Sequence, residues 1–248
     1  MSPSPWFTDL LQPELSPRGV GEGIWSVLPP GSTGQRYDRR AAAYDRVVGN
    51  RLYNRLLWGS SPTSYAAFAR RALRSADGPF LDAGCGSLVF TAEAYAESNR
   101  PILLLDQSIG MLEAARDRLV GAVGRLPARV AMLQADLLDL PFRAASFPTV
   151  LSMGMLHLFA DIDPVLRALE RVVTPGGQLY LTSLVSDRAI GRRYLGLLQR
   201  AGEVAEPRSH PELLSAISAA VGDPIDSFRE GNMSFIVAGS GAADGGSL

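Results

Sequence analysis

The sequence predicts an α/β fold with a seven-stranded, mostly parallel sheet, helices on both faces and a terminal antiparallel hairpin. From residue 78 onward, short apolar runs alternate with helical patterns. A strand recurs about every 25 to 30 residues, as expected when each crossover carries a helix. Near the end, two apolar runs flank Gly231-Asn232 and are close enough to pair. These two observations give the fold class.

Five apolar runs are the predicted parallel strands, and helical patterns separate them. The strand runs are PFLDAG, PILLLD, RVAMLQAD, TVLSMG and GQLYLTSLV, and the clearest helical segments are SIGMLEAARDRLVGAV and DIDPVLRALERVV. A longer helical stretch runs from Ala189 to Val221, in which SHPE at 209–212 resembles a capping box. The strands PIDSFRE and MSFIVAG complete the sheet as its hairpin.

The composition divides the chain into four parts. Residues 1–35 contain six prolines and five glycines together with aromatic side chains, which predicts an arm without regular structure that lies on the body or over a site. Residues 36–76 have a helical pattern and are expected to form an N-terminal helical cap. Residues 77–238 carry the sheet, and residues 239–248 are expected to be a disordered tail.

All 24 basic residues are arginine, and the chain has no lysine. Schiff-base chemistry, phosphate-binding loops that end in Gly-Lys and Tyr-x-x-x-Lys reductase pairs are therefore excluded. The net charge of −1 provides no field that would draw the chain onto nucleic acid or an acidic membrane. A lone cysteine, Cys85, builds neither an internal disulfide nor a thiolate metal site.

No apolar stretch reaches the roughly 18 residues of a membrane span, and the N-terminus lacks the pattern of a secretion signal. We therefore expect a cytoplasmic protein with no membrane span, no metal and no nucleic-acid partner. A small-molecule substrate is the expected partner, and a homodimer stays open.

The turn after the first parallel strand is the place where an open sheet of this kind binds a cofactor. Gly84 and Gly86 allow a tight turn there, and a helix expected to begin near Ser87 would offer its N-terminal amides. Asp106 follows Gly86 by 20 residues, at the end of the next strand, where an acid accepts hydrogen bonds from ribose hydroxyls. Asp136 ends the third strand run and is suited to an adenine amine.

These segments, in this order and spacing, resemble the class I S-adenosylmethionine-dependent methyltransferases, in the branch of the ubiquinone and menaquinone enzymes. The segments that carry the resemblance are LDAGCG, LLLDQSIGMLEAAR, LQADLLDLPF, SFPTVLSMGMLHLFAD, ERVVTPGGQLYLTS and, at 37–47, YDRRAAAYDRV. The resemblance covers residues 36–185 and, through the hairpin, most of the body to 238. It implies a Rossmann-like fold, S-adenosylmethionine as cofactor and methyl transfer to a small, hydrophobic or aromatic acceptor at oxygen, carbon or nitrogen.

The resemblance also implies which residues hold the cofactor, all of them at the strand ends or on the cap. Those implied for the methionine part and the ribose are Asp82, Ala83, Gly84, Gly86, Asp106, Gln107 and Met111. Those implied for the adenine and beneath the sulfonium are Ala135, Asp136, Leu137, Ser152 and Met153. Tyr37 and Tyr44 would close the pocket, because an aromatic face attracts a sulfonium cation.

Two positions depart from the family pattern. Leu88 stands where the family often has a third glycine, whose usual role is close packing of the following helix. Pro148 stands where the family usually has an aspartate. Whether either residue alters the geometry of the cofactor is left open at this point.

In-line displacement at a sulfonium depends mainly on alignment of the acceptor, and a base is needed only when the nucleophile must lose a proton. His157 follows the fourth strand where the acceptor would face the methyl group, so His157 and Tyr37 are the candidate catalytic residues. The alternative is a structural His157 that donates to a backbone carbonyl.

Two other functions stay open. The same fold can bind the cofactor without methyl transfer, as a cyclase or a binding module. A nicotinamide-dependent oxidoreductase also uses a Gly-x-Gly turn followed by an acid.

Overall fold

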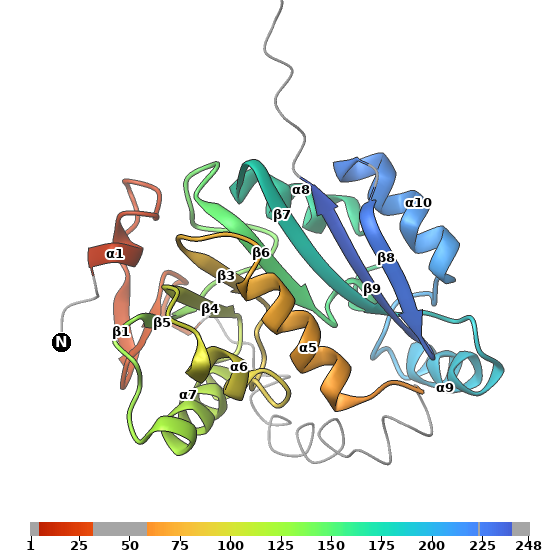
Figure 1. Cartoon of the computed structure of the whole chain (residues 1–248), viewed down its shortest axis with the longest axis horizontal. Helices are drawn as coiled ribbons and strands as arrows, with labels where there is room; N and C mark the ends of the chain where they lie inside the picture. Colours follow the sequence, from red (N-terminus) through yellow and green to blue (C-terminus); the bar gives the residue numbers. More distant parts are fainter. Residues whose placement is uncertain (1–4, 32–58, 223, 240–248) are drawn as a thin grey trace, which may run out of the picture.

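The computed structural model describes residues 5–31, 59–222 and 224–239 (Figure 1). The candidate residues Tyr37 and Tyr44 and most of the expected cap lie outside the described residues. The described part of the expected cap holds one helix, α5 (Pro62–Leu73), whose N-cap Ser61 accepts a hydrogen bond from the Thr63 amide.

The strands form one sheet in the order β1-β2-β5-β4-β3-β6-β7-β9-β8. Its parallel part runs from β2 to β7, and β1, β8 and β9 pair antiparallel. The bounds are β1 (Arg18–Gly21), β2 (Ile24–Ser26), β3 (Phe80–Ala83), β4 (Ile102–Asp106), β5 (Val130–Gln134), β6 (Phe147–Met153), β7 (Val173–Leu184), β8 (Pro224–Glu230) and β9 (Met233–Gly239). The predicted parallel strands and terminal hairpin are confirmed.

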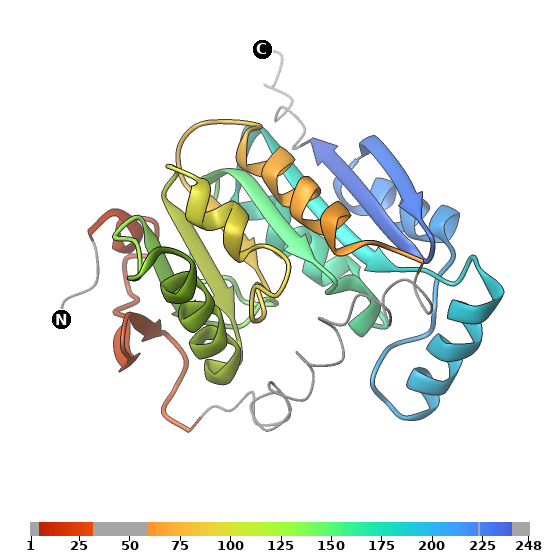
Figure 2. The ribbon, with the colours of Figure 1, turned by 60° about the horizontal axis from the view of Figure 1, so that its bottom comes forward.

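Helices cover both faces of the sheet (Figures 1 and 2). One apolar core joins the sheet to α5, α6 (Ala92–Glu97) and α7 (Ile109–Val123), and the other joins it to α8 (Asp163–Val172) and α10 (His210–Val221). Successive strand residues alternate between the two cores, since Leu81 and Leu103 face one and Phe80 and Ile102 the other. The other helices in the described residues are α1 (Pro5–Thr8), the 3-10 turn η2 (Leu156–Leu158) and α9 (Ala189–Arg200).

The N-terminal arm corrects one prediction. The segment predicted to lack regular structure forms α1, β1 and β2, which raises the strand count from the predicted seven to nine. The expectation that the arm lies on the body holds: Phe7 is fully buried, and Leu11 pairs with Phe142. The arm forms strands despite its prolines and glycines because β2 pairs with β5 and so extends the sheet at that edge.

The N-terminus of α10 has the predicted capping box. The Ser209 hydroxyl accepts from the Glu212 amide, and the Glu212 carboxylate accepts from the Ser209 amide, which is the predicted capping box. Among the described residues, no helix is long and apolar enough to cross a bilayer.

Candidate functional site

The carboxyl ends of β3, β4, β5 and β6 meet at one edge of the sheet. Ala83 pairs with Leu105 and Asp106 with Gln134, so the residues that follow these strands lie side by side. Except for Met111, which lies in the first turn of α7, the described sequence-predicted cofactor residues belong to this edge or to the loops that leave it. The fold therefore brings together residues that lie up to 71 positions apart in the sequence, from Asp82 to Met153.

The glycine turn at this edge requires its glycines. Gly84 has φ +77° and Gly86 has φ +55°, in the left-handed region. A Cβ on Gly84 would lie 2.8 Å from Cγ of Met155, so that side chain packs directly on the turn. The amides of Gly84 and Cys85 both donate to the Leu105 carbonyl, which fixes the turn against β4.

Asp106 connects the two loops of the edge. One carboxylate oxygen accepts from the Gly86 amide at 2.9 Å, and the other accepts from the Ser108 amide at 2.9 Å. The Ser108 hydroxyl in turn caps α7 by accepting from the Met111 amide. A carboxylate oxygen can accept more than one hydrogen bond, so these two amide bonds do not by themselves use up the acceptor capacity of Asp106.

Asp82 is buried at the end of β3, and only 2% of it is exposed. The Tyr95 hydroxyl donates to Asp82 Oδ2 at 2.6 Å. Burial raises the pKa of Asp82 to about 7; the Tyr95 hydrogen bond opposes this and the charge of Asp106 adds to it. A carboxyl group held this way is stabilised in its charged form by a cationic ligand.

The helix after the turn corrects a prediction. It does not begin near Ser87 but at Ala92, and it has six residues. Leu88 is buried and adopts φ +59°, so this leucine has the left-handed backbone conformation that favours glycine. The turn therefore runs through an irregular segment, and α6 begins six residues after Gly86.

The loop after β5 carries the residues expected near an adenine. Ala135 and Leu137 are buried, and the Asp136 carboxylate accepts from the Leu138 amide at 2.9 Å. The Gln134 side chain donates to the carbonyl of Gln107, which joins this loop to the Asp106 loop.

The end of β6 holds a buried hydroxyl without a partner. Ser152 is fully buried, and its Oγ makes no hydrogen bond among the described residues. A buried polar atom without a partner is uncommon and is consistent with a polar ligand at this edge. Pro148 lies at the other end of the same strand, where the register shifts between Phe147 and Thr149, about 16 Å along the strand from Met153.

His157 lies in η2, directly after that strand. Its Nδ1 accepts from the Leu184 amide at 3.5 Å, and its carbonyl accepts from the Ala205 amide at 3.0 Å. The hydrogen bond at Nδ1 thus has the opposite direction to that expected for a structural histidine. Burial lowers the pKa of His157 to about 4, so the ring is neutral at pH 7.

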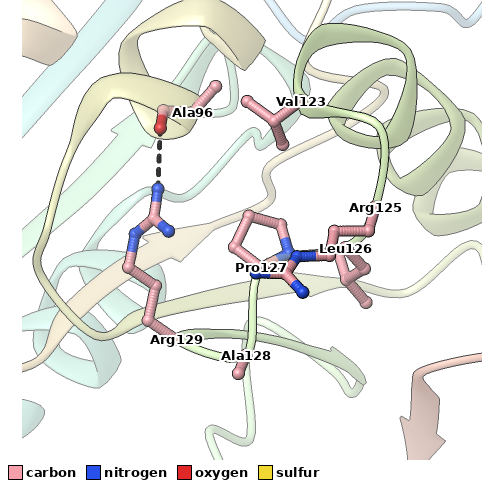
Figure 3. A pocket seen from close by; sticks show the side chains of 7 residues that line it. All are labelled: Ala96, Val123, Arg125, Leu126, Pro127, Ala128 and Arg129. Atoms are coloured by element: carbon pink, nitrogen blue, oxygen red, sulfur yellow. Dashed lines mark hydrogen bonds between the residues drawn. The ribbon is translucent and has the colours of Figure 1, made fainter.

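Two hollows of 530 and 780 Å³ lie elsewhere, at the amino ends of the strands. Figure 3 shows the smaller one, between the ends of α6 and α7 and the loop before β5. Its Arg129 donates to the Ala96 carbonyl at 2.7 Å and so closes the end of α6. Neither hollow borders the glycine turn, and strand direction favours the opposite edge as the ligand site.

Sequence reasoning missed two contributors. Tyr95 holds Asp82 across a strand-helix unit, and its spacing of 13 residues carries no recognisable pattern. The arm reaches the carboxyl edge as well, because the Val27 amide donates to the Gln134 carbonyl. That contact depends on a sheet edge that only the fold creates.

Comparison with known proteins finds relatives over the part of the chain that forms the sheet. A family model described as a methyltransferase domain matches residues 81–181, from β3 to β7. A demethylmenaquinone methyltransferase of Parafrankia sp. (strain EAN1pec) is 30% identical over 210 residues, which cover 77% of this chain and 76% of that protein. Other curated relatives are matched over less of their length, and the chain spans 46% of each of two of them.

Solved structures share the fold. The [4+2]-cyclase SpnF has a TM-score of 0.67 at 19% identity, over 87% of this chain and 99% of that chain. Geranyl diphosphate C-methyltransferase from Streptomyces coelicolor A3(2), solved with S-adenosyl-L-homocysteine, has a TM-score of 0.58 at 14% identity, over 72% and 76%. Together with the family model and the Parafrankia relative, these findings show that the chain belongs to the class I S-adenosylmethionine-dependent methyltransferases.

Proposed function

We propose that the chain binds S-adenosylmethionine at the carboxyl edge and transfers its methyl group to a small, hydrophobic or aromatic acceptor. The observation that carries the proposal is the pair of carboxyl groups around the glycine turn, Asp82 buried below it and Asp106 bonded to Gly86. This pair suits a ligand with a positively charged amino group, a sulfonium and ribose hydroxyls.

The residues present fit that cofactor. Asp106 offers a carboxylate for the ribose and Asp82 a carboxyl group for the amino group, while the buried Ser152 Oγ has no hydrogen-bond partner in the described part of the chain. At Gly84 the Met155 side chain fills the space where a Cβ would lie, so the glycine lets the loop after β6 pack against the turn. When bound, the cofactor supplies an electrophilic methyl group; the chain orients the acceptor, excludes water and receives a proton where one is released.

The geometry disfavours the nicotinamide alternative. A dinucleotide places its pyrophosphate on a helix N-terminus directly after the glycine turn. Here α6 begins only at Ala92, and Asp82 adds a carboxyl group beneath the turn. Both features act against an anionic pyrophosphate.

The ionisation of Asp82 predicts how cofactor affinity depends on pH. Because its pKa is raised to about 7, the carboxyl group is mostly protonated at pH 6 and mostly charged at pH 8. We expect affinity for S-adenosylhomocysteine, which carries the same amino group, to rise about tenfold from pH 6 to pH 8, with proton release in titration calorimetry. Asp82→Asn should bind weakly with no such rise; a wild-type affinity that is flat over this range contradicts the assignment.

The relatives support a small acceptor. The Parafrankia relative is named for demethylmenaquinone and the Streptomyces structure for geranyl diphosphate, both small molecules. We propose an acceptor of this size for this chain, with attack by oxygen, carbon or nitrogen in line with the sulfonium. A screen of cell extracts with isotopically labelled cofactor, read by mass spectrometry, identifies the labelled product.

His157 is the proposed base for an acceptor that must lose a proton. Its ring is neutral at pH 7, and the 3.5 Å contact at Nδ1 lies at the outer limit of a hydrogen bond, so the lone pair is weakly engaged. Tyr37 is the second proposed catalytic residue and lies outside the described residues. We expect His157→Ala to lower kcat about 100-fold.

The control for His157 is the other histidine. The Nδ1 atom of His210 is hydrogen-bonded to the hydroxyl of the buried Ser234 at 2.8 Å, and His210 is expected to be dispensable for turnover. His210→Ala should therefore keep the wild-type kcat. Unchanged turnover of His157→Ala from pH 6 to pH 9 would refute the base assignment.

A cofactor-binding protein without methyl transfer is the second candidate, because SpnF, which shares the fold over most of both chains, is named as a cyclase. The two candidates differ in their products. Stoichiometric S-adenosylhomocysteine and a methylated compound support the transferase, and tight cofactor binding with no turnover on any extract supports the second.

A further inference from the structure

Helix α9 presents an apolar stripe to solvent. Ile190 is 64% exposed and Leu197 is 58% exposed, while Gly191 and Leu195 face the body. At about 100° per residue, Tyr194 lies within about 60° of Ile190 and Leu197 around the helix, and it is half-buried. Single exposed apolar residues are ordinary, but two on one side of a surface helix, next to a half-buried tyrosine, mark an interaction surface.

The charge beside this stripe is uniformly positive. The segment 188–200 contains Arg188, Arg192, Arg193 and Arg200 and no acidic residue. The same helical angle places Arg193 and Arg200 directly next to the stripe, and both are exposed. The side of α9 that faces solvent is therefore apolar along one line and cationic along its border.

The position of α9 leaves this side accessible. Figure 2 shows the helix at the rim of the molecule, beyond the layers that cover the sheet. It is attached through its first turn: the Arg188 amide donates to Asn232 Oδ1 at 2.7 Å, and Asn232 Nδ2 donates to the Arg188 carbonyl at 3.3 Å. A Cβ on Gly191 would lie 1.4 Å from that Asn232 nitrogen, so the contact requires glycine.

We propose that α9 docks the protein on an anionic lipid surface, with Ile190 and Leu197 inserted among the headgroups and Arg193 and Arg200 on the lipid phosphates. An apolar stripe bordered by arginine is the pattern of helices that lie in the membrane interface. The net charge of −1 does not oppose this, because charges more than about 10 Å from the surface are screened. The proposal is independent of methyl transfer.

The test is flotation of the full-length protein with vesicles of equal parts phosphatidylglycerol and phosphatidylcholine, and with phosphatidylcholine alone. We expect binding to the anionic vesicles only, and its loss at high salt. Ile190→Ser/Leu197→Ser and Arg193→Glu/Arg200→Glu should each lower the partition coefficient at least about tenfold.

Two matched variants control for exposure and charge. Ile225→Ser changes an apolar residue on β8 that is 60% exposed, and Arg74→Glu/Arg125→Glu gives the same net charge at exposed sites outside α9. Both should bind like the wild type. Absent binding, equal binding to neutral vesicles, or equal losses in the controls would overturn the proposal. A dimer that dissociates in Ile190→Ser/Leu197→Ser without vesicle binding would instead make this surface a contact between copies.

Discussion

Replacing Asp106 with alanine is expected to lower the affinity for S-adenosylhomocysteine at least about 100-fold, because hydrogen bonds to a charged group are worth roughly 1.5 to 3 kcal/mol each. The change removes the proposed ribose acceptor and also two bonds within the protein, from the amides of Gly86 and Ser108. Both loops that border the ligand would lose their common anchor. Titration calorimetry measures the affinity directly.

Two further variants separate the ribose contact from general loss of charge. Asp117→Ala removes a largely exposed carboxylate from α7 and should bind like the wild type. Asp106→Asn keeps one acceptor oxygen and should fall between the two. Undiminished affinity in Asp106→Ala would show that the ligand is held elsewhere.

Replacing Arg100 with methionine is expected to lower the free energy of unfolding by about 3 to 5 kcal/mol, the cost of leaving several buried polar groups without partners. Only 9% of Arg100 is exposed, and its guanidinium donates to the carbonyls of Leu73, Gly78 and Pro79 and to the Thr149 hydroxyl. It thereby ties the end of α5 to the amino ends of β3 and β6. Burial lowers the pKa of Arg100.

Denaturant unfolding of Arg100→Met and Arg74→Met checks this expectation. Arg74 is exposed at the end of the same helix and should change stability by less than about 0.5 kcal/mol. Equal effects of the two substitutions would mean that the bonds of Arg100 are not needed for stability.

The sequence predicts the central sheet well because both signals used, the spacing of apolar residues and the turn residues at the strand ends, lie within short segments of the chain. The runs that contain Asp82 and Asp106 at or next to their last residue are short, apolar and followed by turn residues, so strand ends and site residues are recognised together. The capping box of Ser209 and Glu212 is likewise a local signal, because it lies within four consecutive residues. The direction of the parallel strands then brings the carboxylates to one edge.

What escapes the sequence depends on contacts between distant segments. The arm forms strands only because β5 offers an edge to Ile24, Trp25 and Ser26, and no short-range pattern reveals that edge. The late start of α6 also has no local signal, because Leu88 occupies a left-handed position that favours glycine. The lack of lysine is compatible with the site, which consists of carboxylates, backbone amides and a hydroxyl.

The most direct test of the account is a crystal structure of the full-length protein with S-adenosylhomocysteine. We expect the ligand at the carboxyl ends of β3 to β6, with its ribose hydroxyls within hydrogen-bond distance of Asp106 and its amino group toward Asp82. A ligand bound instead at the opposite edge, beside Arg100 or Arg129, or a nicotinamide dinucleotide bound in its place at the glycine turn, would contradict the account.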